Sequence, residues 1–135
     1  MGRRWVDGAG VLRVGGDGPP IPLEVAASYR ARTRGLLGRP GIEGALLLTP
    51  ATSVHTFGMR FPIDVAHLDR ALRVIAVTTM PPGRLGLPRL RARHVLEAEA
   101  GAMAAWGLHT GTTLTLALTP DAAPPGGTPG RLTSR

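Results

Sequence analysis

Apolar and polar residues alternate through the middle of the chain, and this alternation constrains the fold more than any other sequence feature. Counted by twos from His55 to His67, one side carries mainly large apolar side chains and the other carries smaller or polar ones. A period of two is typical of a β-strand with one face against a core. Pro62 cannot donate a hydrogen bond to a strand ladder, so we expect two extended pieces that meet at a bend or at an unpaired edge.

Several other short apolar runs between turn-forming residues have the length and composition of strands. Asp69–Ala71 is expected to be a hairpin turn between Ile63–Leu68 and the next apolar strand. The Pro-rich and Gly-rich segment Met80–Arg91 cannot continue a sheet, so a surface loop is expected there. The remaining expected strands are Ile21–Val25, Ala45–Thr49, Leu72–Val77, His94–Ala100 and Leu114–Leu118.

Ala27–Leu37 is the one segment with clear helical spacing, and Ser28 is its candidate N-cap. A second, short helical piece is expected between Gly101 and Trp106. Many strands with one principal helix do not fit alternating β-α-β units. The expected fold is therefore mainly β: a small β-sandwich or partly closed barrel, with the principal helix after the first strand.

The length of 135 residues is that of a single domain. Residues 1–20 have few apolar positions and are expected to form a loose lead-in with at most one strand. Residues 21–118 are expected to form one globular β-rich domain. Residues 119–135 are rich in Pro and Gly without an apolar period, which is typical of a disordered tail.

The sequence contains no cysteine, which excludes disulfides, thiolate nucleophiles and Cys-ligated metal centres. Asp7 and several glycines interrupt any apolar segment after the Arg3-Arg4 pair, so no export signal is expected. No apolar run approaches the roughly 18 residues of a membrane span, so no transmembrane segment is expected. Together these features favour a cytoplasmic protein.

Every basic residue is arginine, and the formal net charge is +7. Ala, Gly, Pro and Arg all have G/C-rich codons, so a G/C-rich genome accounts for much of this arginine content. We expect at most a weak, salt-sensitive attraction to nucleic acids or anionic membranes, through the arginines of Ala27–Leu37 and Arg84–Arg93. Specific nucleic-acid binding is not expected, because few aromatic side chains are present to stack on bases.

His55 and Asp64 lie at the two ends of one bent segment and could converge for general acid–base chemistry. Both residues also have a structural interpretation. His55 has the parity of the core face, where a histidine is more often buried and hydrogen-bonded, and Asp64 could satisfy turn amides or pair with an arginine. Arg60 shares a strand side with Asp64, so it could form a structural ion pair or clamp a substrate.

Glu97 and Glu99 share one parity of their expected strand, opposite to that of Leu96 and Ala98. Both carboxylates are expected to face away from the core or to line one shallow groove. Paired carboxylates can carry out acid–base chemistry, but a solvated strand face is the more common arrangement.

No pattern in the chain predicts a metal or a cofactor. His67, His94 and His109 do not have the spacing of metal ligands. The Gly15–Gly18 segment matches neither a P-loop nor a dinucleotide-binding motif, and no serine lies in a hydrolase nucleophile motif. We therefore expect neither a cofactor nor a metal site.

Three blocks of the sequence resemble, in order and spacing, the domain of unknown function 192 family. They are Arg32–Arg39 (RTRGLLGR), His55–Asp64 (HTFGMRFPID) and Val95–Gly101 (VLEAEAG). The resemblance covers about residues 22 to 118 and implies a compact β-sandwich or barrel with a helix after the first strand, but no particular reaction. The chain departs from the family pattern at Gly58, where an aromatic residue is usual, at Glu99, where proline is usual, and at Gly111-Thr112, where a Gly-Asp pair is common.

Two hypotheses for the function follow. In the first, the protein is a binding or accessory module for a small molecule or a protein partner, and the absence of catalytic motifs favours it. In the second, it is a hydrolase or isomerase in which His55 is the acid or base, Asp64 orients it, and Arg60 or Arg93 binds substrate charge. The first places the ligand on Thr56–Asp64 and Arg84–Arg93, with candidate ligand-binding residues Thr56, Arg60, Asp64, Arg93 and Glu97.

Overall fold

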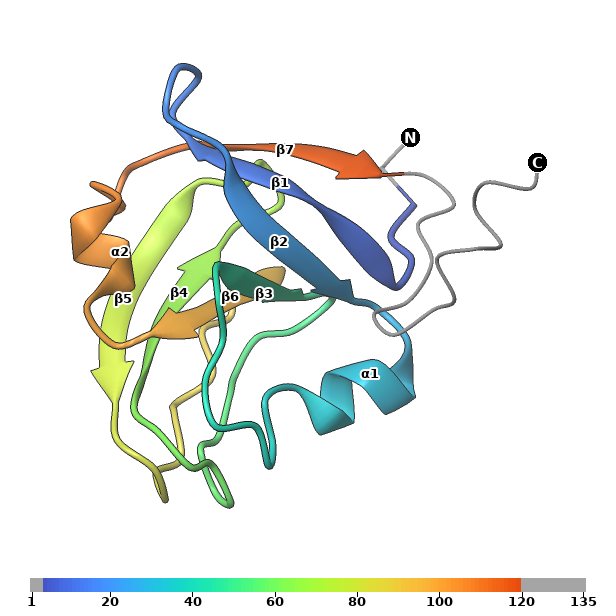
Figure 1. The fold of residues 1–135 in the computed structure, drawn as a ribbon, viewed down its shortest axis with the longest axis vertical. Coiled ribbons are helices and arrows are strands. Elements are labelled where there is room, and N and C mark those ends of the chain that lie inside the picture. The colour runs from blue at the N-terminus through green and yellow to red at the C-terminus, as the bar shows by residue number, and fades with distance from the viewer. Residues whose placement is uncertain (1–3, 120–135) are drawn as a thin grey trace.

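Seven strands form a single mixed sheet in the computed structural model, which describes residues 4–119 (Figure 1). They are β1 (Gly8–Val14), β2 (Ile21–Ala26), β3 (Ala45–Leu48), β4 (Ile63–Leu68), β5 (Val74–Met80), β6 (His94–Glu99) and β7 (Leu114–Thr119). Their order across the sheet is β5-β4-β6-β3-β2-β1-β7. β2 and β3 are parallel, and the other neighbouring pairs are antiparallel. The expectation of a mainly β fold is confirmed.

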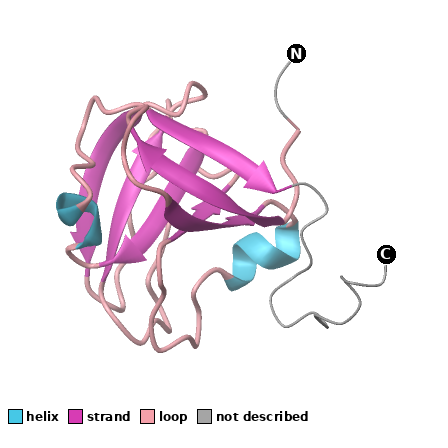
Figure 2. Ribbon diagram, turned by 45° about the horizontal axis from the view of Figure 1, so that its top comes forward, coloured by secondary structure: helices cyan, strands magenta, loops and turns pink. Residues whose placement is uncertain are grey.

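The sheet curls on itself without closing (Figure 2). The segments that precede its two edge strands, β5 and β7, meet at an isolated bridge between Arg73 and Thr113. The concave face encloses an apolar core to which every strand contributes. Its buried members include Leu12, Leu23, Leu47, Leu68, Val74, Leu96 and Leu114.

A second apolar cluster lies on the outer face of the same sheet. Loop residues Leu36 and Val54 cover strand residues there, so the sheet is buried on both faces at its centre. All six residues of β4 are buried for this reason. The strand residues of this outer cluster are Ala26, Leu46, Leu48, Ile63, Val65, Met80 and Val95.

Two short helices accompany the sheet, α1 (Tyr29–Arg34) and α2 (Ala102–Ala105). Ser28 caps α1 as expected, because its hydroxyl accepts a hydrogen bond from the Ala31 amide at 3.1 Å. The helix is shorter than the expected Ala27–Leu37, because Gly35 adopts φ 46° and ends it. Neither helix in residues 4–119 is long and apolar enough to cross a membrane.

The principal helix follows the second strand, not the first as expected. The reason is β1, which lies within the segment for which a loose lead-in was expected and pairs with both β2 and β7. Gly10 lies directly against the backbone of Ala117 in β7, so this glycine, which resembled a loop signal, permits close strand approach. Of the expected tail, 119–135, only Thr119 lies within the described residues, and it ends β7.

Residues 55–62 are a loop, so the expectation of a strand from His55 is wrong for its first half. His55 makes only an isolated bridge with Leu85, and Gly58 adopts φ 78° within a turn. His55 and Phe57 are exposed, although their parity predicted the core face. Regular pairing begins at Ile63, after Pro62, and the expected turn to the next strand is held by Asp69, whose Oδ1 accepts amide hydrogen bonds from Ala71 and Arg73.

Candidate functional site

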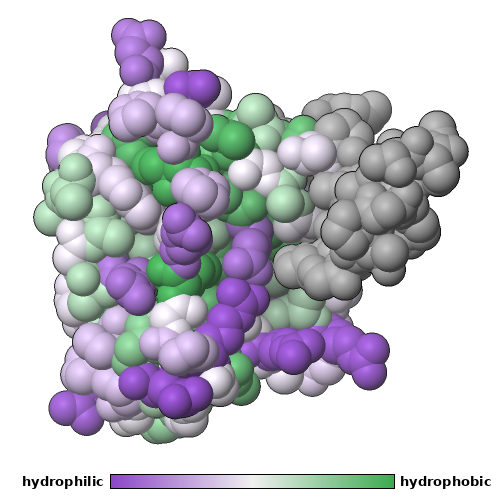
Figure 3. Space-filling model, viewed as in Figure 1, coloured by the Kyte–Doolittle hydropathy of each residue, from purple (hydrophilic) through white to green (hydrophobic). Residues whose placement is uncertain are grey.

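A cleft of about 100 Å³ opens on the outer face of the sheet, between the end of α1 and the 53–59 loop. Its walls combine arginines, apolar side chains and one carboxyl group. Hydrophilic residues gather on the surface where α1 lies (Figure 3). The lining residues used below are Arg32, Arg34, Gly35, Ser53, His55 and Glu97.

Glu97 is the buried carboxyl group of this cleft. It lies on β6 between Val65 of β4 and Leu46 of β3, both members of the outer apolar cluster. Its exposed fraction is only 4%, and it makes no hydrogen bond or ion pair with any residue in 4–119. Burial raises the pKa of Glu97 to about 7, because the charged form loses its hydration.

The end of α1 passes close to the Glu97 carboxyl group. A Cβ atom at Gly35 would lie 4.0 Å from Glu97 Oε1, so no side chain separates the helix terminus from the acid. The positive φ of Gly35 also turns the chain away from the helix at this point. Gly35 therefore ends the helix and keeps the approach to Glu97 open.

Two arginines of α1 line the same cleft. Arg32 is held in place by hydrogen bonds from Nε to the Ala27 carbonyl (3.2 Å) and from Nη1 to the Pro50 carbonyl (3.3 Å). Arg34 is exposed and makes no side-chain hydrogen bond or ion pair within the described chain. Unused guanidinium N–H groups are suited to carboxylate or phosphate oxygens.

His55 also lines the cleft, from its exposed side. Its ring stacks on Phe57, with the ring centroids 5.3 Å apart and the planes inclined by 23°. His55 is therefore a surface residue near Glu97 and not the buried core histidine that its parity suggested.

Asp64 lies on the other side of the sheet from this cleft. Its neighbours Ile63 and Val65 point to the outer cluster, so its own side chain points to the concave face. Oδ1 accepts from the Thr79 hydroxyl at 2.7 Å, and Oδ2 accepts from the amides of Gly101 (2.9 Å) and Met103 (3.1 Å). Asp64 thus fastens the first turn of α2, and the structure does not bring it together with His55.

The other predicted ligand-binding residues lie outside the cleft. Thr56 is buried, and its hydroxyl donates to the Pro81 carbonyl and accepts from the Arg84 amide, both at 2.7 Å. Arg60 is exposed and reaches the Gly38 carbonyl at 3.3 Å, so it does not pair with Asp64. Arg93 is exposed. Of the five, only Glu97 lines the cleft.

Glu99 is exposed, as expected for a solvated strand face, whereas Glu97 is buried and lines the cleft, which fits the expected groove and not the solvated face. The strand alternation gives both the same face, but loops cover that face over Glu97 and leave Glu99 open. Sequence reasoning also missed Arg32, Arg34, Gly35 and Ser53 as residues that line the cleft with Glu97; the arginines of Ala27–Leu37 were expected only to attract polyanions weakly. The described residues contain no group of three or more acidic or histidine side chains that could hold a metal.

The sequence and the fold both have relatives. Residues 11–116 match the sequence profile of a family described as "Uncharacterized ACR", domain of unknown function 192. The chain belongs to this DUF192 family. A UPF0127 protein of Pyrococcus horikoshii is 33% identical over 84 residues, which span 58% of this chain and 73% of that protein, and a UPF0127 protein of Pyrococcus abyssi is also 33% identical, over 58% and 72%.

Two crystal structures share the fold of this DUF192 chain. A protein of unknown function from Novosphingobium aromaticivorans superposes with a TM-score of 0.67 at 20% identity, over 78% of this chain and 83% of that one. A proposed transcription regulator from Sinorhizobium meliloti superposes with a TM-score of 0.73 at 16% identity, over 84% and 98%. At these identities the likeness concerns the fold.

Proposed function

We propose that this DUF192 protein is a binding module for a small anionic ligand that also donates a hydrogen bond, seated in the cleft over Glu97. The carrying observation is that the Glu97 side chain, only 4% exposed, lines the cleft and has no hydrogen-bond or ion-pair partner among residues 4–119. Buried polar groups are nearly always satisfied, so a buried group facing a cleft is suited to a ligand partner. A pKa near 7 lets Glu97 accept or donate a proton as the ligand requires.

The other lining residues support a ligand with a negative charge. Arg32 and Arg34 supply guanidinium groups, which bind carboxylates and phosphates in a forked geometry. Leu36, Leu48 and Val54 supply an apolar wall. A cleft of about 100 Å³ admits only a small group. The ligand class that fits is a small hydroxylated carboxylate or phosphate, with its hydroxyl on Glu97 and its anion on the arginines.

A thermal-shift screen of small hydroxylated carboxylates and phosphates tests the proposal with three proteins: the wild type, Glu97→Leu and Glu99→Leu. Glu99 lies on the same strand and face but is exposed, so it is a matched control. Ligands that stabilise the wild type are expected to stabilise Glu99→Leu equally and to lose their effect on Glu97→Leu. Equal shifts in all three proteins would place the binding site elsewhere.

A second candidate function is acid–base catalysis of the hydrolase or isomerase type. It is favoured by one observation: Glu97, with a pKa of about 7, shares the cleft with His55. A general acid or base works best when its pKa lies near the operating pH. In this candidate function Glu97, and not Asp64, is the acidic partner of His55. Glu97→Gln separates the two functions, because a binding site keeps much of its affinity with an amide, whereas an acid–base catalyst loses turnover.

A further inference from the structure

The loop between β5 and β6, residues 81–93, presents three exposed leucines. The exposed fractions of Leu85, Leu87 and Leu90 are 70%, 79% and 95%. Most large aliphatic side chains of the described chain are buried in one of the two apolar clusters. Several large apolar side chains gathered on one exposed segment mark an interaction surface.

The loop backbone is fastened to the 51–56 segment, so the leucines are held outward. The Arg84 carbonyl accepts from the Thr56 amide at 2.7 Å, and the Gly86 amide donates to the Val54 carbonyl at 2.8 Å. A Cβ atom at Gly86 would lie 2.9 Å from the Val54 carbonyl oxygen, so this position faces the body of the protein. The residues on either side of Gly86, Leu85 and Leu87, are both exposed.

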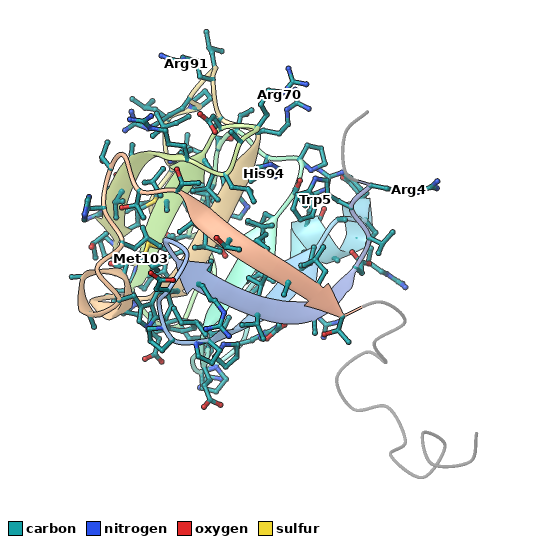
Figure 4. All side chains as sticks on the ribbon, turned by 90° about the horizontal axis from the view of Figure 1, so that it is seen from above. Arg4, Trp5, Arg70, Arg91, His94 and Met103 are labelled. Atoms are coloured by element: carbon teal, nitrogen blue, oxygen red, sulfur yellow. The ribbon has the colours of Figure 1, made fainter. Side chains whose placement is uncertain are left out.

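Arginines flank these leucines in the loop sequence. Arg84, Arg89, Arg91 and Arg93 are exposed, and residues 81–93 contain no acidic side chain. Arg91 projects from the molecule at the same end as Arg70, which lies in the β4–β5 turn (Figure 4). Along the 81–93 loop, exposed leucines are therefore interspersed with exposed arginines.

We propose that the 81–93 loop docks on the surface of an anionic lipid bilayer. The three leucines enter the headgroup boundary, and the arginines contact the lipid phosphates while their aliphatic stems stay in the apolar region. An arginine near an anionic leaflet strengthens partitioning roughly fivefold. This inference rests on the loop and is independent of the Glu97 cleft.

The composition of the loop favours lipid over nucleic acid. Proteins that bind single-stranded nucleic acid combine basic residues with aromatic side chains on which bases stack. Residues 81–93 contain no aromatic residue, and the three leucines would gain nothing from a phosphodiester backbone. A bilayer offers both an apolar boundary and anionic headgroups, so it complements both kinds of side chain.

Co-sedimentation of the full chain with vesicles tests this inference. We compare phosphatidylcholine alone with phosphatidylcholine containing one third phosphatidylglycerol. The wild type is expected to partition at least roughly tenfold more strongly into the anionic vesicles. Leu85→Ser/Leu87→Ser/Leu90→Ser is expected to lose most of this binding. The control Val6→Ser/Tyr29→Ser, which alters apolar side chains 62% and 78% exposed elsewhere, is expected to bind like the wild type.

A charge-matched pair of variants separates loop docking from general attraction by the basic chain. Arg89→Gln/Arg91→Gln is expected to weaken binding by roughly an order of magnitude more than Arg4→Gln/Arg30→Gln. Equal losses in the two pairs, or unchanged binding of the leucine variant, would overturn the inference. Binding of a single-stranded oligonucleotide that needs Arg89 and Arg91 but not the leucines would overturn it in favour of nucleic acid. Circular dichroism verifies that each variant is folded.

Discussion

Glu97 and Val65 face each other across the β4–β6 pair, and both side chains belong to the covered outer face of the sheet. Val65 is fully buried there, and Glu97 is nearly so. A carboxyl group thus occupies a position that the surrounding residues would suit to an aliphatic side chain. This placement has a measurable consequence for stability.

Glu97→Gln is expected to stabilise the protein above neutral pH. The pKa of Glu97 is raised in the folded state from 4.5 to about 7, so the folded protein binds more protons than the unfolded chain between these values. Stability from this group is therefore present below about pH 4.5 and is lost as the pH rises through about 7. The amide stays neutral, so the variant gains up to about 3 kcal/mol at about pH 8 and less at about pH 5.

Urea unfolding of wild type, Glu97→Gln and the exposed control Glu99→Gln at both pH values measures this difference. A stability gap between wild type and Glu97→Gln that does not change with pH would contradict the assigned burial of the acid.

His67 is expected to have the opposite effect on stability. Its side chain is 4% exposed, and neither ring nitrogen has a hydrogen-bond partner in residues 4–119. Burial, together with the nearby charge of Arg89, lowers the pKa of His67 below 6.5. The unfolded chain then binds more protons, so stability falls as the pH drops below about 6.5. His67→Leu is expected to remove this acid sensitivity, whereas His109→Leu, at an exposed site, is not; thermal unfolding from about pH 5 to about pH 8 makes the comparison.

Asp64→Ala is expected to destabilise the fold without changing the affinity of the cleft. The substitution leaves the Thr79 hydroxyl and the amides of Gly101 and Met103 without their acceptor, at a cost of about 3 kcal/mol. The exposed Asp17→Ala is the control. Loss of ligand binding by folded Asp64→Ala would instead return Asp64 to the site.

Thr56→Val is expected to loosen the 81–93 loop. The hydroxyl of Thr56 joins the Pro81 carbonyl to the Arg84 amide, and valine keeps the shape but removes both hydrogen bonds. A loss of about 1–2 kcal/mol follows. Hydrogen exchange measured by NMR should show faster exchange at the Arg84 amide, and unchanged exchange there would contradict the role assigned to Thr56.

The sequence predicted strands correctly where an apolar run also forms hydrogen bonds with a neighbouring strand. Ile63–Leu68 and His94–Glu99, which pair with each other, are examples. β1 was not predicted as a firm strand, because it contains Gly10, a residue type that strand propensity assigns to loops. The structure requires glycine there, since the chain passes close to the backbone of Ala117. The extended pattern from His55 to Phe61 was misleading, because alternation describes side-chain direction and not hydrogen bonding. Only Gly58 and Pro62 indicated the turn and the bend.

The candidate site was harder to predict, because it depends on which face of the sheet is covered. Parity placed Glu97 and Glu99 on one face correctly, but it carries no information about the loops that bury Glu97. For the same reason, the arginines of Ala27–Leu37 were expected only to attract polyanions weakly. All three resemblance blocks, Arg32–Arg39, His55–Asp64 and Val95–Gly101, contribute residues that line the cleft, so their resemblance could have suggested that they lie together.

The central claim is that a buried, unpartnered Glu97 forms the floor of a ligand cleft, and an NMR titration of its side-chain carboxyl carbon tests this most directly. The account predicts a midpoint near pH 7, with the amide chemical shift of Gly35 changing at the same midpoint, because Gly35 lines the same cleft. The carboxyl carbon of Glu99 provides the internal comparison from an exposed site on the same strand. A midpoint for Glu97 near the ordinary value of 4.5 would show a hydrated carboxylate and contradict the proposed site.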